Sequence, residues 1–389
     1  MTKFAAMIWR FLLFLLGVGL LAFPLGARGD DIVIGEYGSL TGGTATFGTS
    51  TDEGVRLAMD QINAAGGVLG QPLRVVVEDD QSKPEAAVTA VQKLISEDHV
   101  VAVIGEVASS RSLAAAPICQ RNHIPMLSPS STNPKVTQVG NFIFRACFID
   151  PFQGAAMANF AMKNDLGPKA TKFAILYDVK NDYSVGLRQF FTETVKANGG
   201  QIVADESYGE GDIDFKAQLT NIEKASPDAI YVPGYYTEVG LICRQARDLG
   251  ITVPLMGGDG WDSDKTFEIG RDAVNGCFFT NHYSPDEDSP RVKDFVAKFQ
   301  AKYSAVPDAM AILGYDAMGM MADAIKRAGS TDGRAIRDAL AHTQNYPGAS
   351  GEITMDRHRN AEKPIVILKI ENDHPHFVAT VQPTASAAP

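Results

Sequence analysis

Short apolar runs alternate with amphipathic helical stretches along most of this chain, and no other feature of the sequence limits its fold as strongly. Residues 32–35, 73–78 and 100–105 are apolar at mostly consecutive positions, as strands buried on both faces of a sheet are. Between the first two runs, residues 51–64 show the i, i+3, i+4, i+7 apolar spacing of a helix. This alternation predicts an α/β fold with a parallel sheet covered by helices.

The same alternation starts again after a break near residues 148–151, which predicts two similar lobes. In the second half we expect four strands, at residues 173–177, 201–205, 229–232 and 254–257. Two further helices are expected at Pro290–Tyr303 and Ala309–Ala328. The last part of the chain is too small for a third domain and is more easily shared between the lobes. The chain would then cross between the lobes several times and form a hinge.

The N-terminal segment is typical of a secretory signal peptide. Basic residues precede an apolar run at residues 11–25, and small residues follow it, with expected cleavage after Ala27 or Gly29. A membrane anchor is the alternative, but the run is shorter than the roughly 20 residues that span a bilayer. We therefore predict residues 1–27 to be a cleaved signal and the mature protein to be periplasmic.

The charge and the missing motifs exclude several functions. The formal net charge is -11, from 35 Lys and Arg against 46 Asp and Glu, and such a surface repels nucleic acid. Nucleophile elbows, zinc-protease motifs, P-loops and dinucleotide fingerprints are absent from the sequence. His374 and His376 are the only close histidines, and Pro375 between them in an expected turn makes a metal site improbable. We expect no enzyme activity, no metal and no cofactor.

Polar residues follow two neighbouring strands of the first half. Val107, Ala108 and Ser109 come after the third expected strand and before a helix, and residues 128–132 follow the next strand. Helix N-termini and hydroxyl groups donate hydrogen bonds to carboxylates. Because the carboxyl ends of parallel strands meet at one edge of a sheet, the two segments predict a ligand site there. The alternative is that Ser109 or Ser110 only caps the helix.

A matching segment of the second half, residues 257–262, contains an acid on a glycine-rich loop. Asp259 in this loop could hold an ammonium group, or it could cap a helix. Trp261 could form the wall of an apolar pocket or pack inside its own lobe. Tyr183 and Tyr235 lie near strand ends and could contact the ligand or belong to the core.

The motifs at these positions resemble those of periplasmic type I solute-binding proteins, in the group that binds branched-chain amino acids (leucine, isoleucine, valine) for ABC importers. The resemblance covers essentially all of the chain after the signal segment. It rests on six segments, at residues 35–42, 63–67, 128–134, 144–154, 257–263 and 365–382. Together these motifs are specific for the family and less specific for the ligand.

The resemblance implies two Rossmann-like lobes with parallel-sheet cores, joined by a three-crossover hinge. One lobe would comprise residues 30–149 and 283–350, and the other residues 150–282 and 351–389. It also implies roles for individual residues. The ligand's carboxylate would be held by Ala108, Ser109, Ser130 and Thr132. The α-ammonium would pair with Asp259, helped by the Ser130 carbonyl. Aromatic and apolar contacts would come from Phe47, Val107, Tyr183 and Tyr235, with Trp261 and Met310 as further candidates.

Two departures from the family pattern bear on these roles. Ala108 stands where family members often carry a cysteine bridged to residues 79–84, so that disulfide is absent. Cys119 with Cys147, or Cys243 with Cys277, could pair in the oxidising periplasm, or all four could be free thiols. Trp261 is bulky for its position, so the pocket could favour a ligand other than leucine, isoleucine or valine.

The functional hypothesis is an extracytoplasmic binding protein that clamps an amino acid between two lobes and delivers it to an ABC permease. A monomer is the default for such delivery, and no nucleic-acid partner is expected. The alternatives are the same fold binding an amide, urea or an aromatic acid, a ligand-sensing domain, and an exported enzyme.

Overall fold

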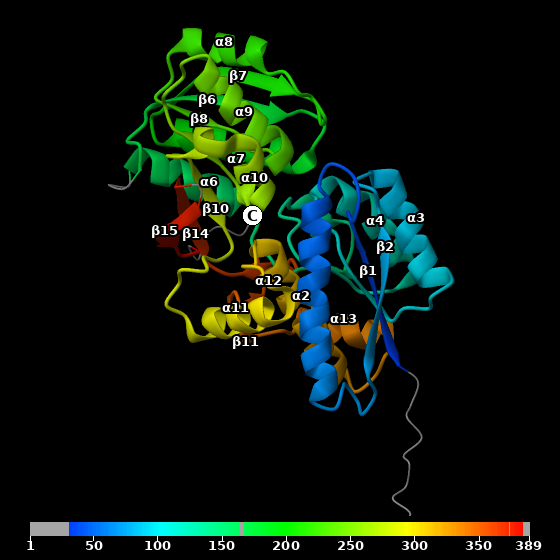
Figure 1. Cartoon of the computed structure of the whole chain (residues 1–389). Coiled ribbons are helices and arrows are strands. Elements are labelled where there is room, and N and C mark those ends of the chain that lie inside the picture. The colour runs from blue at the N-terminus through cyan, green and yellow to red at the C-terminus, as the bar shows by residue number, and fades with distance from the viewer. Residues whose placement is uncertain (1–30, 164–166, 373, 384–389) are drawn as a thin grey trace, which may run out of the picture. The chain divides into compact units, whose positions relative to one another are not determined.

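The computed structural model describes residues 31–163, 167–372 and 374–383 (Figure 1). The predicted signal peptide, residues 1–27, lies outside this part of the chain. None of the helices within the described residues is both long and apolar enough to cross a bilayer. The described chain forms two larger sheets and one small sheet.

The first lobe, as we use the term, is the five-stranded sheet with the helices that pack on it. Its strand order is β2-β1-β3-β4-β5, and every neighbouring pair is parallel. The strands are β1 (Ile32–Gly38), β2 (Leu73–Asp79), β3 (Ala102–Ile104), β4 (Met126–Ser128) and β5 (Ile143–Arg145). The helices are α2 (Ala45–Ala64), α3 (Pro84–Ser96), α4 (Ser109–Asn122), α5 (Lys135–Gln138), α11 (Pro290–Tyr303), α12 (Ala309–Ala328) and α13 (Gly333–Ala341).

Two glycines allow helices α2 and α12 to pack closely, and Figure 1 shows these helices side by side. A Cβ atom on Gly54 of α2 would lie 1.9 Å from the carbonyl oxygen of Ala311. A Cβ atom on Gly314 of α12 would lie 2.4 Å from the carbonyl oxygen of Thr51. Because no larger side chain fits, these positions fix the two helices at short range, and α12 thereby joins the first lobe although it is late in the sequence.

The second lobe is the seven-stranded sheet with its helices. Its strand order is β15-β14-β10-β9-β8-β6-β7. From β10 to β7 in this order all neighbouring strands are parallel, and β14 and β15 extend the sheet beyond β10 by antiparallel pairing. The strands are β6 (Lys172–Asp178), β7 (Gln201–Tyr208), β8 (Ala229–Tyr231), β9 (Leu255–Gly257), β10 (Phe278–Asn281), β14 (Ile365–Glu371) and β15 (His374–Val381). The helices are α6 (Asp150–Lys163), α7 (Asp182–Ala197), α8 (Lys216–Ala225), α9 (Tyr236–Asp248), η1 (Asp259–Trp261), α10 (Asp264–Gly270) and η2 (Arg271–Val274). The predicted α/β fold with two parallel-sheet cores is confirmed.

The chain passes between the two larger sheets three times: after β5, after β10 and before β14. Before the last passage, β11 (Tyr346–Gly348), β12 (Gly351–Met355) and β13 (Ala361–Glu362) form the small sheet. Buried Asp316 accepts hydrogen bonds from the amide of Ser350 (3.0 Å) and from its hydroxyl (2.5 Å) beside this sheet. The Nζ atom of Lys363 donates to the same hydroxyl at 2.5 Å, so a buried polar network holds this crossover.

The exact lobe boundaries remain a prediction. Ile353, Met355 and Ala361 pack in one cluster with Ile34 and Val55 of the first lobe. These contacts favour assigning residues 351–362 to the first lobe, where the sequence had suggested the second.

Candidate functional site

The turn before α4 lies at the carboxyl end of β3, where the sequence predicted a carboxylate site. Val107, Ala108 and Ser109 are all buried, and Ser109 is the first residue of α4. The N-cap residue is Ala108, and no side chain caps the helix. The alternative that Ser109 or Ser110 is only an N-cap is therefore wrong. The free amide groups of the first helical turn remain suited to an anion.

The second polar segment, at the end of β4, presents two buried hydroxyl groups, those of Ser130 and Thr132, which are 3% and 1% exposed. The Thr132 hydroxyl lies beside the Asp150 carboxyl group and lowers its pKa, whereas the Ser130 hydroxyl has no hydrogen-bond partner in the described part of the chain. Buried polar atoms in native proteins are almost always hydrogen-bonded, so the unpaired Ser130 hydroxyl indicates a ligand. Arg145 of β5 holds the loop from behind, with NH1 2.5 Å from the Ser131 carbonyl and NH2 2.7 Å from that of Asn133.

Asp259 lies in the second lobe, directly after β9, and is 3% exposed. Its Oδ1 atom accepts hydrogen bonds from Gln153 Nε2 at 2.6 Å and from the Tyr183 hydroxyl at 2.9 Å. Its Oδ2 atom lies 3.0 Å from Nε2 of His282. Because the carboxylate is engaged by these three groups, the alternative role of Asp259 as a helix cap is wrong.

The negative charge of Asp259 has no cationic partner among the residues the structure describes. His282 is its one ion-pair neighbour within 4 Å, and burial lowers the pKa of this imidazole. A neutral imidazole donates a hydrogen bond and supplies no positive charge. A buried carboxylate that is solvated only by neutral donors attracts a cation such as an ammonium group.

The apolar residues predicted for the pocket come together in one cluster. Phe47, Val107, Tyr183, Tyr235 and Met310 belong to it, and all are at least nine-tenths buried. The Tyr183 and Tyr235 rings stack at 5.3 Å, and the Phe47 ring meets Tyr235 edge-on at 5.5 Å. Since Phe47 comes from α2 and the tyrosines come from the second lobe, the cluster joins the two lobes.

Trp261 does not belong to this cluster, which favours the alternative that it packs inside its own lobe. Its indole is fully buried among core residues of the second lobe and donates from Nε1 to the Val232 carbonyl at 2.9 Å. A Cβ atom on Gly257 would lie 1.9 Å from Nε1, so that glycine makes room for the indole. The size of Trp261 therefore says nothing about the ligand's side chain.

The role predicted for Ala108 also needs a correction. Its amide donates to the carboxylate of Glu106, which precedes it in the same turn. Ser109 keeps two donors for a ligand in this turn, its amide and its hydroxyl hydrogen. The oxygen of that hydroxyl accepts from the Asn133 amide at 3.2 Å.

Asp150 and Gln153 at the start of α6 also lie at the candidate site, and they were not predicted because the sequence pattern there indicates no helix. Asp150 is fully buried, and its carboxyl group lies beside the Thr132 hydroxyl. Burial, together with the charge of Asp259, raises the pKa of Asp150 to about 8, although the Thr132 hydroxyl acts to lower it. Both residues fall inside the family motif at residues 144–154, which was the one available signal.

Hydrogen bonds connect the two lobes around these residues. Asp182, at the start of α7, accepts from the Ser110 hydroxyl (2.9 Å) and, through its carbonyl, from Asn133 Nδ2 (2.7 Å). Elsewhere in the interface, the Thr46 amide donates to the Tyr236 hydroxyl at 3.2 Å. The lobes are thus in direct contact on more than one side of the site.

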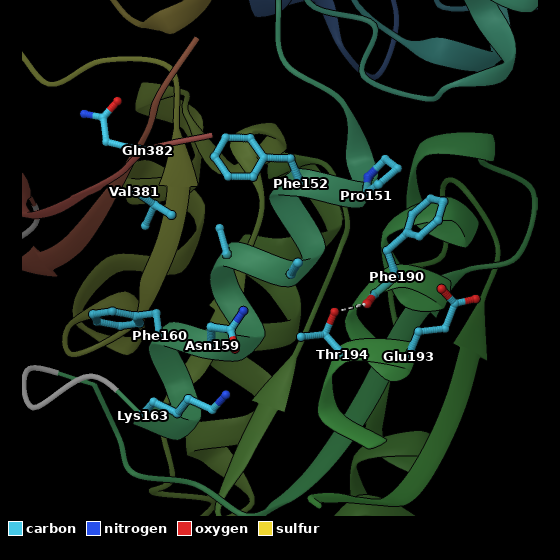
Figure 2. Close-up of a pocket in the computed structure, with 12 residues that line it drawn as sticks. Pro151, Phe152, Asn159, Phe160, Lys163, Phe190, Glu193, Thr194, Val381 and Gln382 are labelled. Carbon is cyan, nitrogen blue, oxygen red and sulfur yellow. Dashed lines mark hydrogen bonds between the residues drawn. The ribbon is translucent and has the colours of Figure 1, made fainter. Parts of the chain in front are cut away.

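A separate groove lies in the second lobe between α6, α7 and β15, with a volume of about 680 Å³ (Figure 2). Figure 2 shows Phe152, Phe160 and Phe190 along it, with Lys163 and Glu193 at its edges. None of the predicted site residues lines it, so it is distinct from the site described above.

The four cysteines are buried free thiols in this structure. Cys119 and Cys147 lie in different core clusters, whereas Cys243 and Cys277 share one. Among the described residues, no group of three His, Cys, Asp or Glu side chains is placed to hold a metal ion.

Two α/β lobes with polar strand ends facing an acid on the opposite lobe define a binding protein, and comparison with known proteins identifies which kind. The chain belongs to the periplasmic binding protein family, whose sequence profile matches residues 31–375. A similar protein is the Leu/Ile/Val-binding protein BraC3 of Rhizobium johnstonii, 33% identical over 326 residues that cover 83% of this chain and 87% of that protein.

Two solved structures are similar over nearly the whole described chain. The leucine-binding protein LivK of Thermotoga maritima is 43% identical, with a TM-score of 0.86, and the alignment covers 90% of this chain and 99% of that one. The branched-chain amino acid binding protein LivJ of Streptococcus pneumoniae, solved with isoleucine, is 33% identical with a TM-score of 0.86. That alignment covers 91% of this chain and 100% of the other. The resemblance predicted from the motifs is confirmed.

Proposed function

We propose that this protein binds an α-amino acid with an apolar, branched side chain and serves as the extracytoplasmic binding component of an ABC importer. The observation that carries the proposal is the pairing of charges across the site. One lobe offers a buried Asp259 carboxylate whose hydrogen-bond donors in the described chain are neutral, and the other offers the unpaired Ser130 hydroxyl and a helix N-terminus. An α-amino acid is a zwitterion whose two charged groups match these two ends.

Binding would proceed by docking on the first lobe and closure of the second. The ligand's carboxylate would accept hydrogen bonds from the Ser109 amide and from the Ser130 and Thr132 hydroxyls. Closure would bring Asp259 onto the α-ammonium group and remove water from both ion pairs. Removing water lowers the local dielectric and strengthens each pair, so ligand and closure stabilise each other.

The preference for an apolar side chain rests on the cluster that joins the lobes. Phe47, Val107 and Met310 supply buried carbon surface there. A branched aliphatic side chain would gain about 25 cal/mol per Å² of apolar surface buried. The names of the similar proteins, a Leu/Ile/Val-binding protein and a leucine-binding protein, support the same ligand class.

The partner we propose is an ABC permease that receives the closed, loaded protein in the periplasm, with the binding protein acting as a monomer. The family is periplasmic by description, and the structurally similar LivJ is called a transporter substrate-binding protein. Binding and release would be the whole cycle, with no chemical turnover.

The test is a thermal-shift screen of unfolded and refolded protein, since refolding removes ligand carried through purification. The panel contains the twenty amino acids, primary amides, urea and aromatic acids. A ligand at 100 times its Kd adds about 2.7 kcal/mol to the free energy of unfolding, which raises the Tm visibly. We expect leucine, isoleucine or valine to give the largest shift. Shifts from amides, urea or aromatic acids alone would contradict the proposal.

A further inference from the structure

Three charged side chains are buried together under the Val107–Ser109 turn, and none of them was assigned a role above. Asp80 follows β2, Glu106 follows β3, and Arg111 lies in the first turn of α4. They are 0%, 1% and 3% exposed. The Nε atom of Arg111 lies 3.2 Å from Oε2 of Glu106 and 3.8 Å from Oδ2 of Asp80. We call these three residues the Arg111 cluster.

The cluster connects the start of α4 to three strand ends. The Glu106 carboxylate accepts from the Ala108 amide, and its Oε1 lies 3.1 Å from the Ser39 hydroxyl. The same hydroxyl donates to Oδ1 of Asp80 at 2.7 Å. Arg111 also donates from NH2 to the Thr44 hydroxyl at 2.7 Å and from NH1 to the Ser82 carbonyl at 3.3 Å. The Arg111 guanidinium group and the two carboxyl groups therefore connect the turn that presents Ser109 to residues that follow β1 and β2.

The charges of the cluster do not balance, since two acids face one cation. Burial, and then the charge of Glu106, raise the pKa of Asp80 to about 7. Burial alone would lower the pKa of Arg111, but the neighbouring carboxyl groups of Glu106 and Asp80 raise it. Buried ion pairs of this kind are often no more stabilising than apolar residues of the same size, so stability alone explains them poorly. A positioning role explains why they lie behind the turn.

We propose that Arg111 is a positioning residue for the carboxylate group of the ligand. It holds Glu106 and Asp80, and through them it holds the Val107–Ser109 turn in the geometry that presents the Ser109 amide and hydroxyl. This inference rests on the proposed function, because it concerns how the amino acid's carboxylate is received. It makes a prediction that a purely structural role does not make. Loss of the cluster must weaken ligands that carry a carboxylate more than ligands that lack one.

The experiment measures two affinities by calorimetry on refolded protein: the Kd of the best amino acid and the Kd of its primary amide. Arg111→Lys keeps the charge but loses the planar fork that reaches both acids and two further acceptors. We expect this variant to lose at least tenfold in affinity for the amino acid and no more than about twofold for the amide, since a charged hydrogen bond is worth tenfold or more. The ratio of the two Kd values is the result that matters.

A second variant keeps the test decisive if Arg111→Lys does not fold. The double variant D80N/R111Q removes one acid and one cation, so the net charge of the cluster stays the same, and the Kd of the amino acid divided by the Kd of the amide is again expected to rise. Arg188→Gln is the control, because Arg188 pairs with Asp205 on the surface of the second lobe and should leave both affinities unchanged.

The outcomes separate this inference from the proposed function. If the wild-type protein binds amino acids and the variants lose both ligands equally, Arg111 is structural and the inference is wrong, while the proposed function stands. If the wild-type protein binds no amino acid, the proposed function fails and this inference fails with it. A loss of affinity for the amino acid, with the affinity for its amide nearly unchanged, supports both this inference and the proposed function.

Discussion

Replacing Asp150 with asparagine should stabilise the ligand-free protein at neutral pH and leave its stability almost unchanged in acid. Asp150 is fully buried, with the Thr132 hydroxyl beside its carboxyl group. Burial and the charge of Asp259 outweigh the lowering effect of that hydroxyl and raise the pKa of Asp150 from 3.8 to about 8. The folded protein therefore holds this proton over a pH range in which the unfolded chain releases it.

The sign and size follow from proton linkage. Because the folded state binds the extra proton, the free energy of unfolding falls as the pH rises from about 4 to about 8, and it is constant above that range. Each pH unit costs about 1.4 kcal/mol, so the penalty at pH 7 reaches about 4 kcal/mol as an upper bound. Asparagine has no proton to release and avoids the penalty. The difference between Asp150→Asn and wild type should grow from near zero at pH 4 to a few kcal/mol at pH 7.

The assay is urea denaturation of wild type and each variant, all refolded, at pH 3, 4, 5.5, 7 and 8. Asp228→Asn is a matched control of opposite sign, since hydrogen bonds from the Thr171 and Lys172 amides lower the pKa of Asp228. That variant should lose stability above pH 4, and its loss should shrink as the pH falls below that value. A difference between Asp150→Asn and wild type that stays flat from pH 4 to pH 8 would refute the argument from burial.

Three other substitutions test the site and one correction to it. Tyr183→Phe removes the hydroxyl that donates to Asp259 and accepts from the Gly260 amide, and calorimetry should show roughly tenfold weaker amino-acid binding. Gly186→Ala would place a Cβ atom 2.7 Å from Asp150 Oδ2 and 2.9 Å from Asn133 Nδ2 of the first lobe, so amino-acid affinity should fall roughly tenfold and the free energy of unfolding by about 1–3 kcal/mol. Trp261→Phe should lower the free energy of unfolding by about 1–3 kcal/mol, since it loses a buried hydrogen bond, and should leave the Kd within twofold. A large loss of affinity in Trp261→Phe would restore that residue to the pocket.

Much of the fold could be predicted because its helices and strands carry regular apolar patterns. Helices α11 and α12 begin and end at the predicted residues, Pro290–Tyr303 and Ala309–Ala328. Pro290 suits the first turn of one helix, and Asp308 and Gly329 cap the other, with the Asp308 side chain accepting from the Ala311 amide. Local signals and the tertiary structure agree at these positions.

Other elements were missed because their local signals are weak. Helix α6 begins at Asp150 with proline next, and its buried residues lie on nearly all sides, so it shows little amphipathic pattern. Strand β10 is only four residues long and lies between a 3₁₀ turn and a crossover. Buried elements of this kind are defined by packing against the rest of the lobe, which one sequence does not show.

The site was predictable where a motif placed a polar residue at a strand end, as with Ser130, Thr132 and Asp259. It was not predictable where distant segments meet. His282 and Gln153 reach Asp259 from a crossover and from α6, and no spacing in the sequence links them. Trp261 was considered for the pocket because it lies in the same loop as Asp259, but its side chain packs in the core of the second lobe.

The central claim is that Asp259 holds the ammonium group of an amino acid, and one titration tests it most directly. Refolded wild-type protein and Asp259→Asn are titrated by calorimetry with leucine, isoleucine and valine, with circular dichroism confirming that both are folded. The account predicts one site per chain in the wild type and at least a tenfold higher Kd in the variant, because the asparagine supplies no negative charge. Equal affinity of the two folded proteins, or no binding of any amino acid by the wild type, would contradict it.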